Sequence, residues 1–123
     1  MAILADAPPA RLERLETRLN CSRGLAIRFA AGLWLPHLQN RYLELASALR
    51  ATDTRRAVDL AGRIHDAARI GDAREIVEAM ETIAAYASRG RWDAAISRFR
   101  EANHQLKEVT QYVSTLDRSS GEV

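Results

Sequence analysis

Apolar residues recur at intervals of three and four along most of the chain, which is the spacing of one face of an α-helix. The clearest example lies between Asp53 and Gly71. The core-facing stripe of this helix is expected to consist of Ala57, Leu60, Ala61, Ile64 and Ala68. Asp53 suits the N-cap because its carboxylate can accept a backbone N–H of the first turn. Gly71 suits the C-terminal end because glycine readily adopts the left-handed conformation that ends many helices.

A second row of side chains follows the same helix outside the apolar stripe. Helical spacing places on this row, here named the 58–69 face, the residues Val58, Gly62, His65, Asp66 and Arg69. A glycine inside a helix costs roughly 0.5–1 kcal/mol relative to alanine, so Gly62 requires an explanation. One structural explanation is that Gly62 lets a neighbouring helix or loop approach closely.

The same spacing predicts two helices in the first part of the chain. Two prolines followed by leucines predict a short helix over residues 9–19, since proline is tolerated in a first turn. Ser22 is expected to cap a longer helix over residues 23–50. Pro36 lies inside this helix and should kink it, because proline has no backbone N–H to donate. The alternative is two helices with a break near Trp34.

Two more helices are predicted after residue 71. Asp72 is expected to cap the first, over residues 73–88, and the second should run from residue 92 to about residue 117. Arg89, Gly90 and Arg91 form a tight connection between them. The expected core residues outside the central helix are Leu12, Leu15, Leu19, Ile27, Ala31, Leu35, Leu38, Tyr42, Leu45, Leu49, Ile76, Val77, Met80, Ile83, Ala84, Ala87, Ile96, Phe99, Ala102, Leu106, Val109, Val113 and Leu116.

Short connections between consecutive amphipathic helices favour antiparallel neighbours. The sequence therefore predicts an all-α fold, an antiparallel four-helix bundle with a short additional N-terminal helix. Residues 9–117 should form this single domain, with flexible ends at residues 1–8 and 118–123. Trp34 and Trp92 are expected to anchor the core or the helix ends, and His104 to lie on the surface. His37 has no partner within reach on its own helix.

Composition and charge narrow the classes of function. The 18 Lys and Arg residues and the 16 Asp and Glu residues alternate along the helices, which leaves a net charge of +2 and no nucleic-acid footprint. Cys21 is the only cysteine, which excludes an internal disulfide and fits a reducing cytosol. The histidines fall on separate predicted helices without neighbouring ligands, so neither a metal nor a cofactor is expected. Without a signal peptide or a run of about 18 apolar residues, the chain is expected to be soluble and cytoplasmic, with no membrane contact.

Several stretches resemble the histidine-containing phosphotransfer (HPt) domain family. Phe29, Pro36 and Leu38 precede the stretch Leu45-Ala46-Ser47-Ala48-Leu49 and Asp53, which is similar to the family's "L..L..AL...D". Residues 60–66 (LAGRIHD) are similar to its acceptor motif "LAHxLKG". The likeness continues at Gly71, Ala73, Ile76, Met80, Ile83 and Gly90. It covers most of residues 10–116 and implies a four-helix bundle on whose flank an exposed histidine accepts a phosphoryl group from a receiver-domain aspartate.

The acceptor motif departs from the family pattern. When residues 60–61 are matched to the family's "LA", and Ala73 and Ile76 to its downstream "GAxxL", Gly62 takes the place of the acceptor histidine. In the same register the family's leucine, lysine and glycine are replaced by Ile64, His65 and Asp66. Placing His65 at the acceptor position shifts the alignment by three residues and loses the downstream match.

The resemblance therefore implies a pseudo-HPt module without the acceptor and without enzymatic activity. Such a module would bind a receiver domain or a histidine kinase through the 58–69 face. A first alternative is an active phosphotransfer protein that uses His65, with Arg69 as the cation that offsets the phosphoryl charge. A second alternative is a structural or oligomer-forming helical bundle. The simplest structural interpretation of His65 is a boundary residue that hydrogen-bonds to a neighbouring helix.

Overall fold

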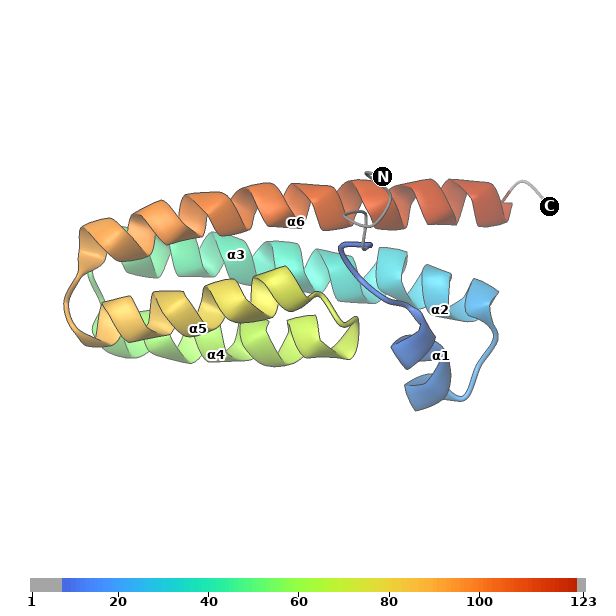
Figure 1. Ribbon diagram of the computed structural model, residues 1–123, viewed down its shortest axis with the longest axis horizontal. Coiled ribbons are helices and arrows are strands. Elements are labelled where there is room, and N and C mark those ends of the chain that lie inside the picture. Colours follow the sequence, from blue (N-terminus) through green and yellow to red (C-terminus); the bar gives the residue numbers. More distant parts are fainter. Residues whose placement is uncertain (1–7, 122–123) are drawn as a thin grey trace, which may run out of the picture.

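The computed structural model describes residues 8–121, and Figure 1 shows that they form packed helices. The elements, including one π-helical turn (η2), are α1 (Glu13–Leu19), α2 (Arg23–Phe29), η2 (Ala30–Trp34), α3 (Leu35–Arg50), α4 (Thr54–Ile70), α5 (Arg74–Ser88) and α6 (Trp92–Gly121). No strand occurs within residues 8–121, so the predicted all-α class is confirmed for this part of the chain. Residues 1–7, which belong to the end expected to be flexible, lie outside the described part.

The long helices contact their neighbours in the chain. α4 packs against α3 and α5, and α5 also packs against α6. The returning α6 contacts α3 and α2, so that helices α3 to α6 share one hydrophobic core (Figure 1). The chain turns back on itself after α3, α4 and α5, and α1 lies beside α2 at one end (Figure 1). Among the described helices, none has both the length and the apolar character that crossing a membrane requires.

Two of the predicted helix caps are confirmed. The Asp53 carboxylate accepts the backbone N–H of Arg56 at 3.1 Å, which satisfies a free donor in the first turn of α4. The Ser22 hydroxyl accepts the backbone N–H of Leu25 at 3.3 Å at the start of α2. Both residues therefore begin their helices in the way that local side-chain chemistry predicts.

Asp72 does not cap α5, so that prediction is wrong. The N-cap of α5 is Ala73, and no side chain caps this end. The backbone of Asp72 is left-handed (φ 53°), and its carboxylate lies among three arginines. The distances to the Nε atoms of Arg11, Arg14 and Arg74 are 3.8, 3.9 and 3.4 Å. The carboxylate thereby links the segment around α1 to the turn between α4 and α5.

Gly71 follows the last residue of α4 as predicted, but the expected reason is wrong. Its φ is −98°, and the left-handed residue is the next one, Asp72. A Cβ atom at Gly71 would overlap the indole ring of Trp34. The N–H of Arg11 also donates to the Gly71 carbonyl at 2.7 Å. Glycine is required here because the indole ring and a second backbone segment approach the turn closely.

The irregularity expected near Pro36 is a π-helical turn and not a break between two helices. The N–H of Leu35 donates to the carbonyl of Ala30, five residues earlier. Pro36 has no N–H for the carbonyl of Gly32, and its ring needs space in the preceding turn. The wider π-turn provides this space, and the backbone remains helical from residue 23 to residue 50.

Most of the apolar stripes predicted from spacing lie in the core. All five stripe residues of α4 are buried. Leu19 is the clearest error: it is 44% exposed, because α1 ends there and the left-handed Asn20 turns the chain away. α1 also begins later than predicted, at Glu13, although Leu12 is buried. Some expected core residues are only half-buried at the edge of the core: Ala31, Val77, Ala84, Ile96 and Leu116.

The C-terminal end of α6 differs from the prediction. The helix was expected to end near Asp117, but it continues to Gly121. Residues 118–121 of the tail expected to be flexible are therefore helical, and residues 122–123 lie outside the described part.

Burial of Tyr42 predicts a specific loss of stability in alkali. Its hydroxyl donates to the carbonyl of Ala102 at 3.3 Å. Burial raises the pKa of this phenol far above its usual value, and the positive charge of Arg98 offsets part of that rise. Below about pH 10 the phenol is neutral in the folded and in the unfolded chain. Above about pH 10 only the unfolded chain releases the proton, so the free energy of unfolding falls by up to about 1.4 kcal/mol per pH unit. In urea titrations, the free energy of unfolding of the wild type minus that of Tyr42→Phe should fall between about pH 9 and pH 11. A constant difference would contradict the buried phenol.

Candidate functional site

Gly62 lies on the outer surface of α4 with open space around it. The residue is exposed, and no neighbouring atom lies within 4 Å of the position that a Cβ atom would take. The explanation that Gly62 permits the close approach of another segment is therefore wrong. The position that the HPt register assigns to the acceptor is on the surface and presents bare backbone.

The open space predicts that Gly62→Ala stabilises the protein. Alanine loses less backbone entropy than glycine in a helix and meets no neighbour at this position, so the free energy of unfolding should rise by about 0.5–1 kcal/mol. Urea denaturation followed by circular dichroism measures the change. Destabilisation by this substitution would show that another segment uses the space beside Gly62.

The other members of the 58–69 face surround this glycine. Val58 is half-buried, whereas Asp66 and Arg69 are exposed. Next to Gly62, the Nε of Arg63 lies 2.9 Å from the carboxylate of Asp59 one turn earlier. The face therefore carries charges of both signs around a central position without a side chain.

His65 is held between two carboxylates at the edge of the face. Its side chain is 22% exposed, with Nδ1 3.2 Å from an oxygen of Asp66 and Nε2 3.0 Å from an oxygen of Glu81 on α5. The interpretation of His65 as a boundary residue that hydrogen-bonds to a neighbouring helix is confirmed. Glu81 was missed because it lies sixteen residues further along the chain, and only the packing of α5 on α4 brings it to the imidazole.

This arrangement is unfavourable for nucleophilic attack by His65. A ring nitrogen that donates to a carboxylate has no lone pair available for a phosphorus atom. The two carboxylates also place negative charge where a phosphoryl group would have to approach. A neutral imidazole has one N–H, so one ring nitrogen donates to a carboxylate and the other keeps its lone pair, which faces the second carboxylate.

Arg69, the cation of the His65 alternative, lies one helical turn after His65 on α4 and is exposed. It also lines a hollow together with Arg14, Arg74 and the partly buried Asp72. Its position on α4 therefore agrees with the spacing, and whether it would offset a phosphoryl charge stays a prediction.

A groove adjoins the 58–69 face on the side of α3. Its apolar lining includes Phe29, Trp34 and Ile70, and Asp66 belongs both to the groove and to the face. The groove has a volume of about 570 Å³. Leu33 at its border is 65% exposed, which adds apolar surface next to the charged α4. The sequence pattern did not reveal this groove, because it depends on how η2 packs against α4.

Of the remaining candidate residues, Trp34 and His37 line the same groove beside η2, whereas His104 and Trp92 lie on α6. His37 is exposed in the groove beside η2, and His104 is exposed on α6 as predicted. Trp34 is buried and Trp92 is half-buried at the start of α6, which agrees with their predicted roles as anchors. Within residues 8–121, no three His, Cys, Asp or Glu side chains are arranged to hold a metal ion.

Comparisons of the chain with protein-family models, with curated proteins and with solved structures found no match.

Proposed function

We propose that this chain is an HPt-like protein of a two-component phosphorelay that lacks the acceptor histidine. In this proposal helices α3 to α6 correspond to the antiparallel four-helix bundle of that family. The 58–69 face docks on a receiver domain, or on the equivalent surface of a sensor kinase, without taking up its phosphoryl group. The protein then acts by occupying its partner and not by catalysis.

The observation that carries the proposal is the exposed, open backbone at Gly62. Glycine at an exposed helix position lowers stability by roughly 0.5–1 kcal/mol relative to alanine, and no packing contact requires glycine at this position. A surface role explains this cost, because the missing side chain leaves room for another protein to approach α4. The resemblance of residues 60–66 to the acceptor motif supports the choice of a receiver domain as that protein.

The groove beside η2 supports docking at this flank. Leu33 and Phe29 offer apolar area there, while Arg63 and Asp66 at the groove offer polar contacts. An apolar centre with a polar rim is the usual composition of a protein–protein interface. The carboxylates around His65 disfavour the alternative in which this residue carries phosphate.

Phosphoryl transfer tests the proposal directly. Receiver domains labelled with radioactive phosphate are expected to leave no label on the wild-type protein. Gly62→His is expected to acquire label, because a side chain at this position meets open space next to the docked receiver. Label on the wild-type protein that disappears in His65→Ala would overturn the proposal in favour of an active phosphotransfer protein.

Docking is tested separately by isotope-edited NMR titration with the same receiver domains. Gly62→Arg should weaken binding at least about tenfold, because it places a long side chain in the centre of the interface. Ser97→Arg, at an exposed position on α6, is the matched control and should bind like wild type. Equal affinities for the two variants, or a wild-type dimer that Gly62→Arg dissociates in light scattering, would contradict receiver docking.

A further inference from the structure

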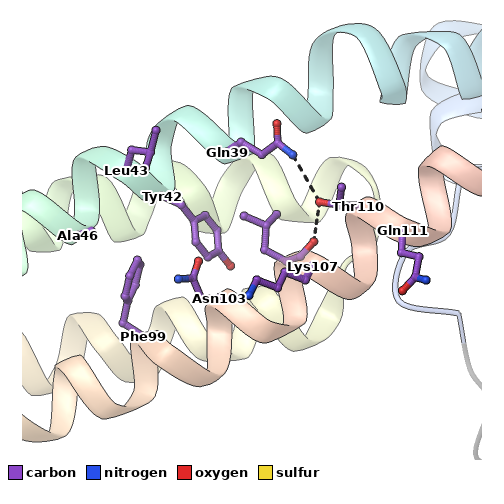
Figure 2. A pocket seen from close by; sticks show the side chains of 10 residues that line it. Gln39, Tyr42, Leu43, Ala46, Phe99, Asn103, Lys107, Thr110 and Gln111 are labelled. Atoms are coloured by element: carbon purple, nitrogen blue, oxygen red, sulfur yellow. Dashed lines mark hydrogen bonds between the residues drawn. The ribbon is translucent and has the colours of Figure 1, made fainter.

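A second apolar groove lies between α3 and α6. Figure 2 shows the rings of Tyr42 and Phe99 between the two helices, and with Leu106 they form the floor of the groove. The two rings are 5.7 Å apart between centroids and tilted by 39°. The groove has a volume of about 450 Å³, which is within the usual range of about 300–1,000 Å³ for binding pockets.

The groove is open because α3 and α6 pack less closely than α5 packs against α4 or α6. The side chain of Gln39 reaches across it to Thr110, but this hydrogen bond is long (3.5 Å) and exposed (Figure 2). Ala46 on the α3 side is too small to fill the space opposite Phe99. Protein interiors are normally closely packed, so an open seam along two long helices is available to an additional element.

Leu43 enlarges the apolar surface at this seam. It lies on the border of the groove and is 71% exposed, the highest value among the exposed large apolar side chains of residues 8–121. A single exposed leucine is ordinary on a protein surface. An exposed leucine that borders an apolar groove makes the patch continuous, and continuous patches mark interaction sites.

The ionised side chains directly beside this groove are cations. Lys107 lines the groove, and helical spacing places Arg100 on the same face of α6. Arg50 lies two turns after Leu43 on the same face of α3 and is exposed.

Three acidic residues, Glu44, Glu101 and Glu108, lie on other faces of the two helices. Glu44 is 3.8 Å from Arg56 on α4, and Glu101 is 3.5 Å from Arg98. Helical spacing places Glu108 on the side of Glu101. Helical spacing places Asp93 and Asp117 on this side of α6 as well, but beyond the two ends of the groove, whose α6 lining runs from Phe99 to Gln111. Beside the groove itself the charge is therefore positive, although the whole chain has a net charge of only +2.

We propose that the groove between α3 and α6 binds an amphipathic helix of a partner protein with an apolar ridge and acidic flanks. The ridge fits between Leu43 and the aromatic floor, in the manner of helix-in-groove recognition. The acidic flanks face Lys107, Arg100 and Arg50, which orient the helix and accelerate its association.

A partner of different chemistry fits less well. In a symmetric dimer the same patch meets itself, and the cations beside the groove would then lie opposite the same cations. The charged backbone of a nucleic acid would not cover the exposed Leu43 or the apolar floor. The groove lies on the seam of α3 and α6, whereas Gly62 faces outward from α4, which packs between α3 and α5. This second surface therefore does not depend on the function proposed for the 58–69 face.

A synthetic helical peptide with leucines at intervals of three and four and glutamates elsewhere serves as the probe, and the same peptide with lysines is its charge control. Leu43→Asp is expected to weaken binding of the glutamate peptide at least about tenfold, and Lys107→Glu about three- to tenfold. Leu25→Asp, at an exposed leucine of α2, is the matched control and should bind like wild type. All three substitutions are at exposed positions, and circular dichroism checks that the variants remain folded.

NMR shifts locate the peptide, and anisotropy of a fluorescent label gives its affinity. Shifts centred on Gln39, Leu43, Asn103 and Lys107, with weak binding of the lysine peptide, are the expected result. The proposal is overturned if the protein shows no shifts at millimolar glutamate peptide, or if both peptides bind equally. It is also overturned if light scattering shows a dimer that Leu43→Asp dissociates, which would identify a second copy as the occupant. Binding to phosphatidylglycerol vesicles that Leu43→Asp abolishes would likewise overturn it in favour of a membrane surface.

Discussion

Trp34→Ala is expected to remove about 3–5 kcal/mol from the free energy of unfolding, the usual cost of deleting a buried large aromatic side chain. Trp34 is 3% exposed and packs where η2, α4 and the turn at Gly71 meet. Its indole N–H donates to the carbonyl of Ala67 at 2.7 Å. This carbonyl is one of the last four of α4, which have no partner within the helix. The substitution therefore creates a cavity and also leaves a buried acceptor unpaired.

Urea denaturation followed by circular dichroism measures this loss, and Trp34→Phe separates its two causes. The phenylalanine variant keeps much of the ring volume but not the N–H, so it should lose only about 1–3 kcal/mol. Trp92→Ala is the control on the other tryptophan, which is half-buried, and it should cost less than Trp34→Ala. Similar losses for Trp34→Ala and Trp92→Ala would contradict the central role of Trp34.

Gly71→Ala is expected to destabilise the protein by about 1–3 kcal/mol through overpacking. A methyl group at this position overlaps the benzene part of the Trp34 ring, and the ring is itself held by the carbonyl of Ala67. The ring therefore cannot move aside without loss of its hydrogen bond. Urea denaturation measures the effect, with Gly62→Ala as the matched control because that position is free of neighbours.

A double-mutant cycle tests whether the indole ring causes this effect. In the Trp34→Ala background the space opposite residue 71 is empty, so Gly71→Ala should cost much less there than in the wild type. Equal costs in both backgrounds would show that the backbone conformation of residue 71, and not the contact with Trp34, explains the glycine.

The helices and most of the core were predictable because they depend on residues that are close in the sequence. Asp53 and Ser22 cap their helices through hydrogen bonds to N–H groups three residues ahead. The buried stripe of α4 follows from the helical repeat alone. Asp72 is an exception: its polar side chain next to a helix start predicts a cap, but its carboxylate lies among three arginines, two of them from the segment around α1.

The candidate site was predictable only in part. Helical spacing correctly grouped the residues that surround Gly62 on one flank of α4, and it indicated that His65 lies at the border of that flank. The partner Glu81, the adjoining groove and the absence of any neighbour over Gly62 could not be predicted. Each of these depends on how closely other helices approach α4, which one helix's own sequence does not specify.

The sequence by itself determined which segments are helical, where most of them begin and which faces are apolar, because caps, helical repeats and proline act over a few residues. Only the tertiary structure decided that Trp34 covers Gly71, that Glu81 holds His65, and that α3 and α6 leave a groove between them. These features join residues from separate helices. They depend on the shape in which several side chains pack together, and no spacing along one helix specifies that shape.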